Sequence, residues 1–221
     1  MNHMTPRTIE TISQDGILAR NKVLRQTYIL LGMNVLFSAL CAYVGMLMGI
    51  RVHYGIALLG IMALSWGVQA NRNNGLGIVL LFAFTGLLGF YVAYVLNMFV
   101  SYGLGSVVVK ALVGTGIIFF ALSAYVLFTG TNFTFLGGFL FTGLLVAFLA
   151  GLGATIFHMT ALSVAVSAAF LVICSGLVLF HTSRIIEGEE TNYITATMDL
   201  FMALFNIFVS LLNILSAFNR N

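Results

Sequence analysis

Seven apolar runs that follow one another almost without interruption constrain this chain more than any other feature of its sequence. An α-helix needs roughly 20 apolar residues to cross the hydrocarbon core of a bilayer, and most of the runs reach that length. The runs are 26–50, 53–70, 76–99, 104–128, 134–157, 161–183 and 193–218. Because the connections are short, the sequence predicts an all-α polytopic membrane protein with seven transmembrane helices whose neighbours run antiparallel. The second run is short, and a re-entrant segment is the alternative for one of the seven.

The composition excludes several other classes of protein. Of the 221 residues, 61% are hydrophobic and 7% are charged, and a soluble domain of this size cannot bury so much apolar surface. The basic residues behind the net charge of +3 are scattered or lie beside the first run, so the expected partner is the lipid bilayer and not a nucleic acid. The HExxH, CxxC and GxSxG motifs are missing from the sequence, so we expect no metal site, no cofactor and no enzymatic activity.

Residues 1–25 differ from the rest of the chain because they are polar. We interpret them as a flexible cytoplasmic tail ahead of a bundle formed by residues 26–221, since they have too little apolar character to fold alone.

Lysine and arginine, which are enriched in cytoplasmic segments, indicate the orientation. If the N-terminus is cytoplasmic, the basic residues on that side are Arg7, Arg20, Lys22, Arg25, Arg72 and Arg184. Those on the far side are Arg51, Lys110 and Arg220. The sequence therefore predicts a cytoplasmic N-terminus and, with seven crossings, a C-terminus on the far side of the membrane.

The last run, 193–218, carries a stripe of polar side chains although it is long enough to span a bilayer. At about 100° per residue, the members of the stripe fall within an arc of about 60°. They are Thr195, Asp199, Asn206, Ser210 and Asn213. Hydrocarbon offers these groups no hydrogen-bond partner, so the stripe is expected to face protein or a wet cavity. It serves either as polar contacts that hold the bundle together or as a polar site or ion path, and both alternatives make this helix central.

The sixth run repeats this pattern. Ser163, Ser167, Cys174 and His181 fall within about 40° of one another on a helix. The two stripes could therefore face each other, and the short connection between the runs places His181 and Asp199 on the same side of the membrane. We expect these two side chains to come within reach of a direct or water-bridged hydrogen bond. A pair of this kind could respond to protons near neutral pH. The alternative is that His181 lies at the membrane interface, where it is hydrated or bonded to a backbone carbonyl.

Glycines recur in several of the apolar runs. Small residues let helices approach closely in membranes. The pairs are Gly45 with Gly49, Gly86 with Gly89, and Gly114 with Gly116. In a chain with 23 glycines such pairs are weak evidence for any particular contact, and they predict only a tightly packed bundle.

Several stretches resemble a known family. The last third contains FHTSRII (180–186), ETNYI (190–194) and NIFVSLL (206–212), and supporting stretches are KVLRQTY (22–28), FAFTG (82–86), SAYVL (123–127) and FLGG (135–138). Together they resemble the Bax inhibitor-1 (TMBIM) family, and the last third is the most specific part. The resemblance implies six helices wrapped around a central, C-terminal seventh.

The resemblance also implies a function. Bacterial inner-membrane members of the family bind the membrane protease FtsH, restrain it and are degraded by it, so the chain is expected to be an inner-membrane modulator and substrate of FtsH. Its tail, with Arg7, Arg20 and Lys22, would then be the handle from which an ATP-driven protease starts. The alternative is a pH-sensitive leak for calcium or other cations, to which the family is also linked.

The sequence departs from the family at the residues that matter for such a leak. The family's pH sensor is a pair of acids on the last two helices, and these positions fall on His181 and Ala203. Neither residue is acidic, although Asp199 lies one turn before Ala203. The departure favours the protease-related role. The candidate polar or proton-sensing site comprises His181, Asp199, Asn206, Ser210 and Asn213.

Overall fold

The computed structural model describes residues 6–51, 54–157 and 159–219, and the side chains from residue 21 onward except those of 54 and 160. Within these ranges the chain forms seven α-helices, one short 3₁₀-helix and no strand. The α-helices are α1 (Pro6–Met48), α2 (Tyr54–Ala70), α3 (Gly75–Ser101), α4 (Gly105–Thr129), α5 (Gly137–Ile156), α6 (Thr160–Glu187) and α7 (Tyr193–Phe218), and η1 (Thr134–Leu136) precedes α5. The predicted all-α architecture is confirmed.

Six helical segments are long and apolar enough to cross a membrane: 21–48 in α1, then α3, α4, η1 with α5, α6 from 161, and α7. The apolar part of α2, Gly55–Ala70, is shorter. The chain is therefore a polytopic membrane protein with six or seven apolar helices. A seventh crossing by α2 stays a prediction.

The connection between α6 and α7 is shorter than the sequence indicated. We expected a loop from Arg184 to Asn192, but α6 continues to Glu187 and ends at Gly188. Gly188 has a φ of 78°, and its N–H donates to the carbonyls of Arg184 and Ile185. Glycine adopts this left-handed conformation without steric penalty, so it stops the helix one turn later than the change from apolar to charged residues suggests.

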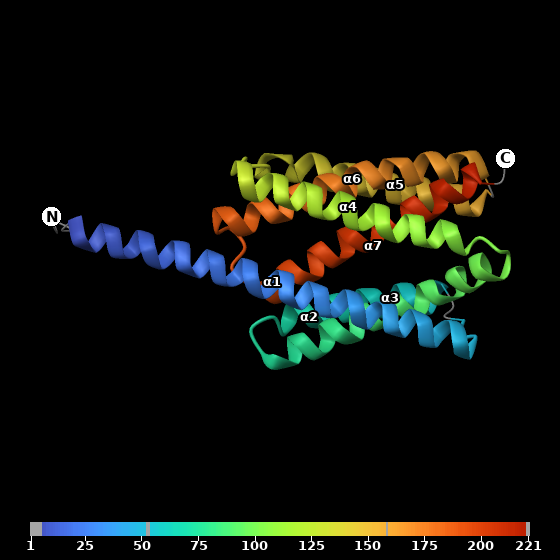
Figure 1. Ribbon diagram of the computed structural model, residues 1–221, viewed down its shortest axis with the longest axis horizontal. Helices are drawn as coiled ribbons and strands as arrows, with labels where there is room; N and C mark the ends of the chain where they lie inside the picture. Colours follow the sequence, from blue (N-terminus) through green and yellow to red (C-terminus); the bar gives the residue numbers. More distant parts are fainter. Residues whose placement is uncertain (1–5, 52–53, 158, 220–221) are drawn as a thin grey trace.

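The first helix extends far beyond the membrane-spanning length. It begins at Pro6 and includes most of the segment predicted to be a tail. Figure 1 shows this part of α1 (dark blue) projecting away from the other helices. The flexibility predicted for residues 1–25 stays a prediction. Residues 1–5 lie outside the described residues.

Two groups of helices lie on either side of α7. In Figure 1, α1, α2 and α3 form one group, α4, α5 and α6 form the other, and α7 (red) runs between them. Helix α7 packs against α1, α2, α3, α4 and α6, whereas α5 packs against α6 and η1. The large side chains that are fully buried include Leu200 and Ile207 of α7 and Phe84 of α3.

Candidate functional site

The polar stripes of α6 and α7 face each other, as expected from the helical periodicity. We call this contact, which runs from Ser163 and Asn213 to His181 and Asp199, the seam. At one end of this seam, the side-chain amide of Asn213 donates to the hydroxyl oxygen of Ser167 over 2.7 Å and to that of Ser163 over 3.1 Å. These are neutral hydrogen bonds of ordinary length between two helices. This end of the seam therefore joins the helices through satisfied polar contacts.

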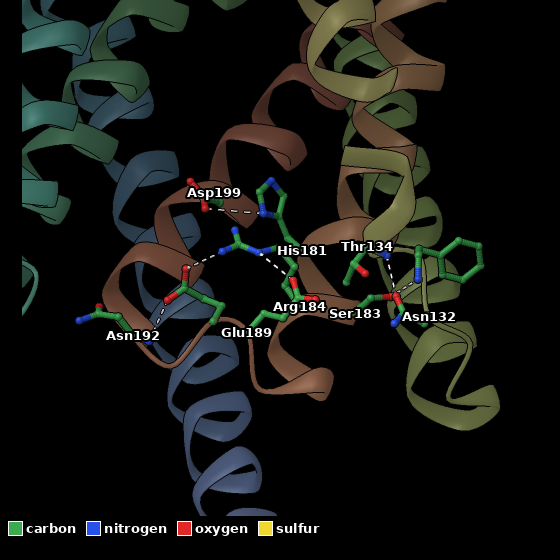
Figure 2. A network of polar contacts seen from close by, with 10 residues as sticks. Asn132, Thr134, His181, Ser183, Arg184, Glu189, Asn192 and Asp199 are labelled. Carbon is green, nitrogen blue, oxygen red and sulfur yellow. Dashed lines mark hydrogen bonds and ion pairs between the residues drawn. The ribbon is translucent and has the colours of Figure 1, made fainter. Parts of the chain in front are cut away.

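The other end of the seam holds the two ionisable side chains. Nδ1 of His181 lies 3.6 Å from Oδ2 of Asp199, and the two side chains are 15% and 23% exposed. Figure 2 shows the imidazole directed toward the carboxylate. The distance is that of an ion pair and is too long for a direct hydrogen bond. The structure thus brings together the two residues singled out from the sequence.

A cavity of about 370 Å³ opens beside this pair between α5, α6 and α7. His181 and Asp199 line it together with Cys174 and Asn206, and Phe141 and Leu177 are among its apolar walls. The cavity makes this end of the seam different from the Asn213 end, because a ligand or solvent molecule has room next to an ionisable pair. Cys174 is buried and forms no disulfide with a described cysteine.

The remaining stripe residues have less to do with the cavity. Asn206 lines it, but its amide nitrogen donates to the carbonyl of Met202 within α7 over 2.8 Å. Ser210 is buried one turn further along α7. Among the described residues, no group of three His, Cys, Asp or Glu side chains is arranged to hold a metal ion.

Charged side chains of the α6–α7 connection lie just outside the pair. Nε of Arg184 is 3.7 Å from Glu189, and its Nη2 is 3.6 Å from Glu190. Glu190 also accepts a hydrogen bond from the backbone N–H of Asn192 over 2.9 Å. Figure 2 shows Arg184 between the connection and the His181–Asp199 pair. The two glutamates thereby hold the guanidinium beside the entrance to the seam.

Asn192 joins this connection to the opposite group of helices. Its side-chain oxygen accepts from the N–H groups of Ile194 and Thr195 and caps α7. Its side-chain nitrogen donates to the carbonyl of Arg72 over 2.9 Å and to the amide oxygen of Asn73 over 3.0 Å. One residue therefore caps the central helix and fastens it to the α2–α3 turn.

The comparisons with known proteins decide the family. The family model for "Inhibitor of apoptosis-promoting Bax1" matches residues 20–220. This chain belongs to the Bax inhibitor-1 family. A relative from Escherichia coli K12, named "Modulator of FtsH protease YccA", is 45% identical over 93% of this chain and 94% of its own length. An uncharacterized protein of Pasteurella multocida is 42% identical over 91% of this chain and 92% of its own. A membrane protein of Vibrio cholerae is 38% identical over 98% and 99%.

Because the chain belongs to the Bax inhibitor-1 family, the residues that line the cavity can be compared with the acidic pair of that family. The positions that the resemblance assigned to the family's acidic pair are His181 and Ala203, and both line the cavity with Asp199. The cavity therefore has an imidazole and a methyl group at these two positions, and its carboxylate comes from Asp199, one turn before Ala203. Asp199 is the one carboxylate among the described residues that line the cavity, whereas sites for divalent ions such as Ca²⁺ usually combine several oxygen ligands.

Sequence reasoning missed the loop contacts of this site. Ser183 accepts a hydrogen bond from the N–H of Phe133 over 3.1 Å and donates to the carbonyl of Thr131 over 3.3 Å, which fixes the α4–α5 connection to α6. Nothing in the sequence pattern marks this serine. Asn192 carried a usable signal, because an Asn directly before an apolar helix is a common N-cap. Of the predicted handle, Lys22 is exposed, whereas the side chains of Arg7 and Arg20 lie outside those described.

Proposed function

We propose that this protein is an inner-membrane modulator and substrate of the FtsH protease. The observation that carries the proposal is the 45% identity, over nearly the full length of both chains, to the relative named as a modulator of FtsH protease. A second relative from Escherichia coli with the same identity is named "Inner membrane protein YccA". No motif of an enzyme competes with this role, and we infer that the chain has no catalytic activity of its own.

The long first helix supports the proposal. A protease driven by ATP needs a segment that it can engage before it extracts the rest of a membrane protein. Residues 6–20 continue α1 beyond its membrane-spanning part and project away from the bundle in Figure 1. The exposed backbone of such a projecting terminus is the part of a fold that unfolds at least cost. We place this segment, with Arg7, Arg20 and Lys22, in the cytoplasm as the handle.

The finer topology also belongs to this proposal. We infer seven crossings, with six helices arranged around α7, a cytoplasmic N-terminus and a periplasmic C-terminus. The contacts of α7 with five other helices support a central position, and α5 joins the bundle through α6. The excess of lysine and arginine on the side of the α2–α3 and α6–α7 connections supports the orientation.

Deletion of residues 2–20 tests the handle. We expect the shortened protein to fold and to have a severalfold longer half-life than the full chain in a chase of protein level in cells with active FtsH. The matched control keeps the length and replaces Arg7, Arg20 and Lys22 by Gln, which separates the need for a segment from the need for its charge. Both proteins should be equally stable in cells that lack FtsH. An unchanged half-life after deletion would count against the handle.

The modulator role has a separate test. Overproduction of the full chain should slow the degradation of a second membrane substrate of FtsH, measured in the same chase. A chain that disappears with FtsH but leaves the second substrate unaffected is a substrate only, and the proposed modulation would then be wrong.

A cation leak is the second candidate, because the Asp199 carboxylate and His181 line a cavity of about 370 Å³. Flux of Ca²⁺ or K⁺ into liposomes that contain only the purified protein tests this function. We expect Asp199→Asn to abolish any such flux, whereas Asn213→Leu at the other end of the seam should leave it unchanged. Equal flux in liposomes with wild type and with Asp199→Asn would exclude the cavity as the path.

The charge of Asp199 should also affect the titration of His181. If the 3.6 Å contact persists in the bilayer, replacement of Asp199 by Asn should displace the titration of the His181 ring. Ring resonances of His181 followed by NMR against pH, in wild type and Asp199→Asn, measure the effect. Identical curves would show that the pair does not interact.

A further inference from the structure

A second cavity lies on the other side of the molecule and is not part of the site described above. It is a groove of about 540 Å³ between α1 and α4, with α7 as its floor. Both helices pack against α7, yet the backbones of α1 and α4 do not approach each other within the described residues. Tyr28 and Met46 of α1 mark its two ends, and Phe201 and Phe205 of α7 line its floor.

The groove opens sideways toward the bilayer. Leu36 and Tyr43 on the α1 rim, and Leu112 and Phe120 on the α4 rim, are all more than half exposed. The lining side chains are nearly all apolar, so water gains few hydrogen bonds there. An unfilled groove would also forfeit the dispersion contacts of its walls. Hydrocarbon is therefore the material that fits its chemistry.

The shape of the groove favours an acyl chain over a helix. From Tyr28 to Met46 the groove extends about 27 Å at 1.5 Å per residue. At the Tyr28 end the rings of Tyr28 and Phe119 lie with their centroids 6.0 Å apart across it, whereas an α-helix with side chains is about 10–12 Å in diameter. A single file of methylene groups, about 4 Å wide at carbon–carbon contact distance, needs far less room.

Two glycines face each other across this space. Tyr28 of α1 and Phe119 of α4 approach with ring centroids 6.0 Å apart, which aligns the two antiparallel helices. Gly32 and Gly116 each lie about one turn deeper into the membrane than these rings, on opposite walls. A Cβ atom added to either glycine would meet no atom within 4 Å. Both positions therefore have room for at least a methyl group on the wall of the groove.

Positive charge stands at the mouth of the groove. Arg25 precedes Tyr28 by three residues and Gly32 by seven, so it lies on the groove face of α1 by helical periodicity. Lys22 lies one turn before it, and both side chains are exposed. The hydroxyl of Thr197 donates to the carbonyl of Thr27, which places Arg25 level with the first turn of α7 at the membrane edge. Neither Lys22 nor Arg25 forms an ion pair with a described carboxylate.

We propose that this groove binds an acyl chain of an anionic phospholipid from the leaflet on the side of the α6–α7 connection, with Arg25 and Lys22 holding the headgroup phosphate. The lipid completes the wall between α1 and α4. The binding site shares Lys22 with the proposed FtsH handle, and it is separate from the cavity beside Asp199.

Native mass spectrometry of the purified full chain in detergent tests the proposal. The probes are palmitoyl-oleoyl phosphatidylglycerol and phosphatidylethanolamine with the same chains. We expect wild type to retain one phosphatidylglycerol and to prefer it at least fivefold. Gly32→Leu and Gly116→Leu should each reduce the retained lipid about tenfold, because leucine occupies the groove. Gly153→Leu is the matched control, since a Cβ at Gly153 of α5 also meets no atom within 4 Å but lies outside the groove.

The headgroup has its own variant. Each basic side chain near an anionic membrane surface contributes roughly 1 kcal/mol, so Arg25→Gln should lower the preference for phosphatidylglycerol about fivefold. Binding of phosphatidylethanolamine should stay as in wild type. An undiminished preference would overturn the assignment of Arg25.

The same spectra report whether a protein occupies the groove instead. If wild type is a dimer and the leucine variants are monomers, the occupant is a second copy of the chain, and the lipid proposal is wrong. Retention of phosphatidylglycerol by both leucine variants at the level of Gly153→Leu would overturn it as well. Thermal unfolding of each variant confirms that it is folded, and the two walls provide independent variants.

Discussion

The two faces of α1 use glycine in opposite ways. Toward α3, a Cβ on Gly89 would overlap with the carbonyl oxygen of Ser38, and a Cβ on Gly45 would lie 2.7 Å from that of Ala93. Toward α4, Gly32 stands over open space. The first face is closed because hydrogen is the only substituent that fits between the backbones. The second is open at Gly32 because no atom of the chain lies within 4 Å of the place a Cβ would take. Glycine in a membrane helix therefore indicates either a close contact or a gap.

A buried polar pair reinforces the closed face. The hydroxyl of Thr85 on α3 donates to the side-chain oxygen of Asn34 on α1 over 2.9 Å, and both residues are fully buried. Asn34 in turn donates to the carbonyl of Leu30 within α1 over 2.8 Å. The groove face has apolar walls. The difference teaches that, on α1, a buried polar pair and closely packed glycines occur together on the face that packs against α3.

The largest effect is expected at Gly89. Gly89→Ala should destabilise the protein by about 3 kcal/mol or more, because the new methyl group collides with backbone that cannot move aside within the α1–α3 contact. Unfolding in mixed micelles with increasing denaturing detergent measures the loss. A stability within 0.5 kcal/mol of wild type, taken as roughly the usual size of neutral changes, would mean that α1 and α3 are not closely packed.

A smaller loss is expected when the buried polar pair is broken. Asn34→Leu keeps a similar volume and should cost about 1–2 kcal/mol in the same assay, since Thr85 loses its partner on α1. Thr85→Val and the double variant complete a cycle, in which we expect a coupling free energy of about 0.6–1.7 kcal/mol. Additive losses would show that the hydrogen bond contributes nothing to the closed face.

The link between the two groups of helices gives the next effect. Asn192→Ala should cost about 1 kcal/mol through loss of the α7 cap. It should also speed amide hydrogen exchange in the α2–α3 turn, which loses the contact with Asn192. Asn192→Asp is the matched control, because a carboxylate keeps the cap but cannot donate to Arg72. Exchange as slow in Asn192→Ala as in wild type would contradict the role of Asn192 in joining the groups.

The smallest effect is expected on the open face. Gly32→Ala should leave stability unchanged or raise it by a few tenths of a kcal/mol up to about 1, because alanine favours the helix and meets no neighbour. The comparison with Gly89→Ala in the same detergent series isolates packing from helix propensity. A loss comparable to that of Gly89→Ala would mean that α1 and α4 come together in solution, and the contrast between the two faces would fail.

The helices and the seam between α6 and α7 were predictable because local rules govern them. Hydrocarbon requires every backbone group to be paired within a helix, so apolar length alone gave segments close to α2 through α7. The period of 3.6 residues placed His181 on the same face as Ser163 and Asp199 on the same face as Asn213. Those faces meet in the structure. The predicted end of α6 was wrong because its charged residues were taken as the start of a loop. A helix tolerates charged residues outside the membrane, and α6 continues to Glu187.

The sequence by itself determined that this chain forms apolar helices in a membrane, which helices carry polar stripes, and which family it belongs to, because hydropathy, helical period and motif are read along one dimension. Only the tertiary structure decided that Gly89 is closed in and Gly32 is not, that Asn192 reaches Arg72, and that α1 and α4 stay apart. These features depend on distances between residues that are far apart in the chain, and a residue's own chemistry is the same whether its neighbour is 3 Å or 10 Å away.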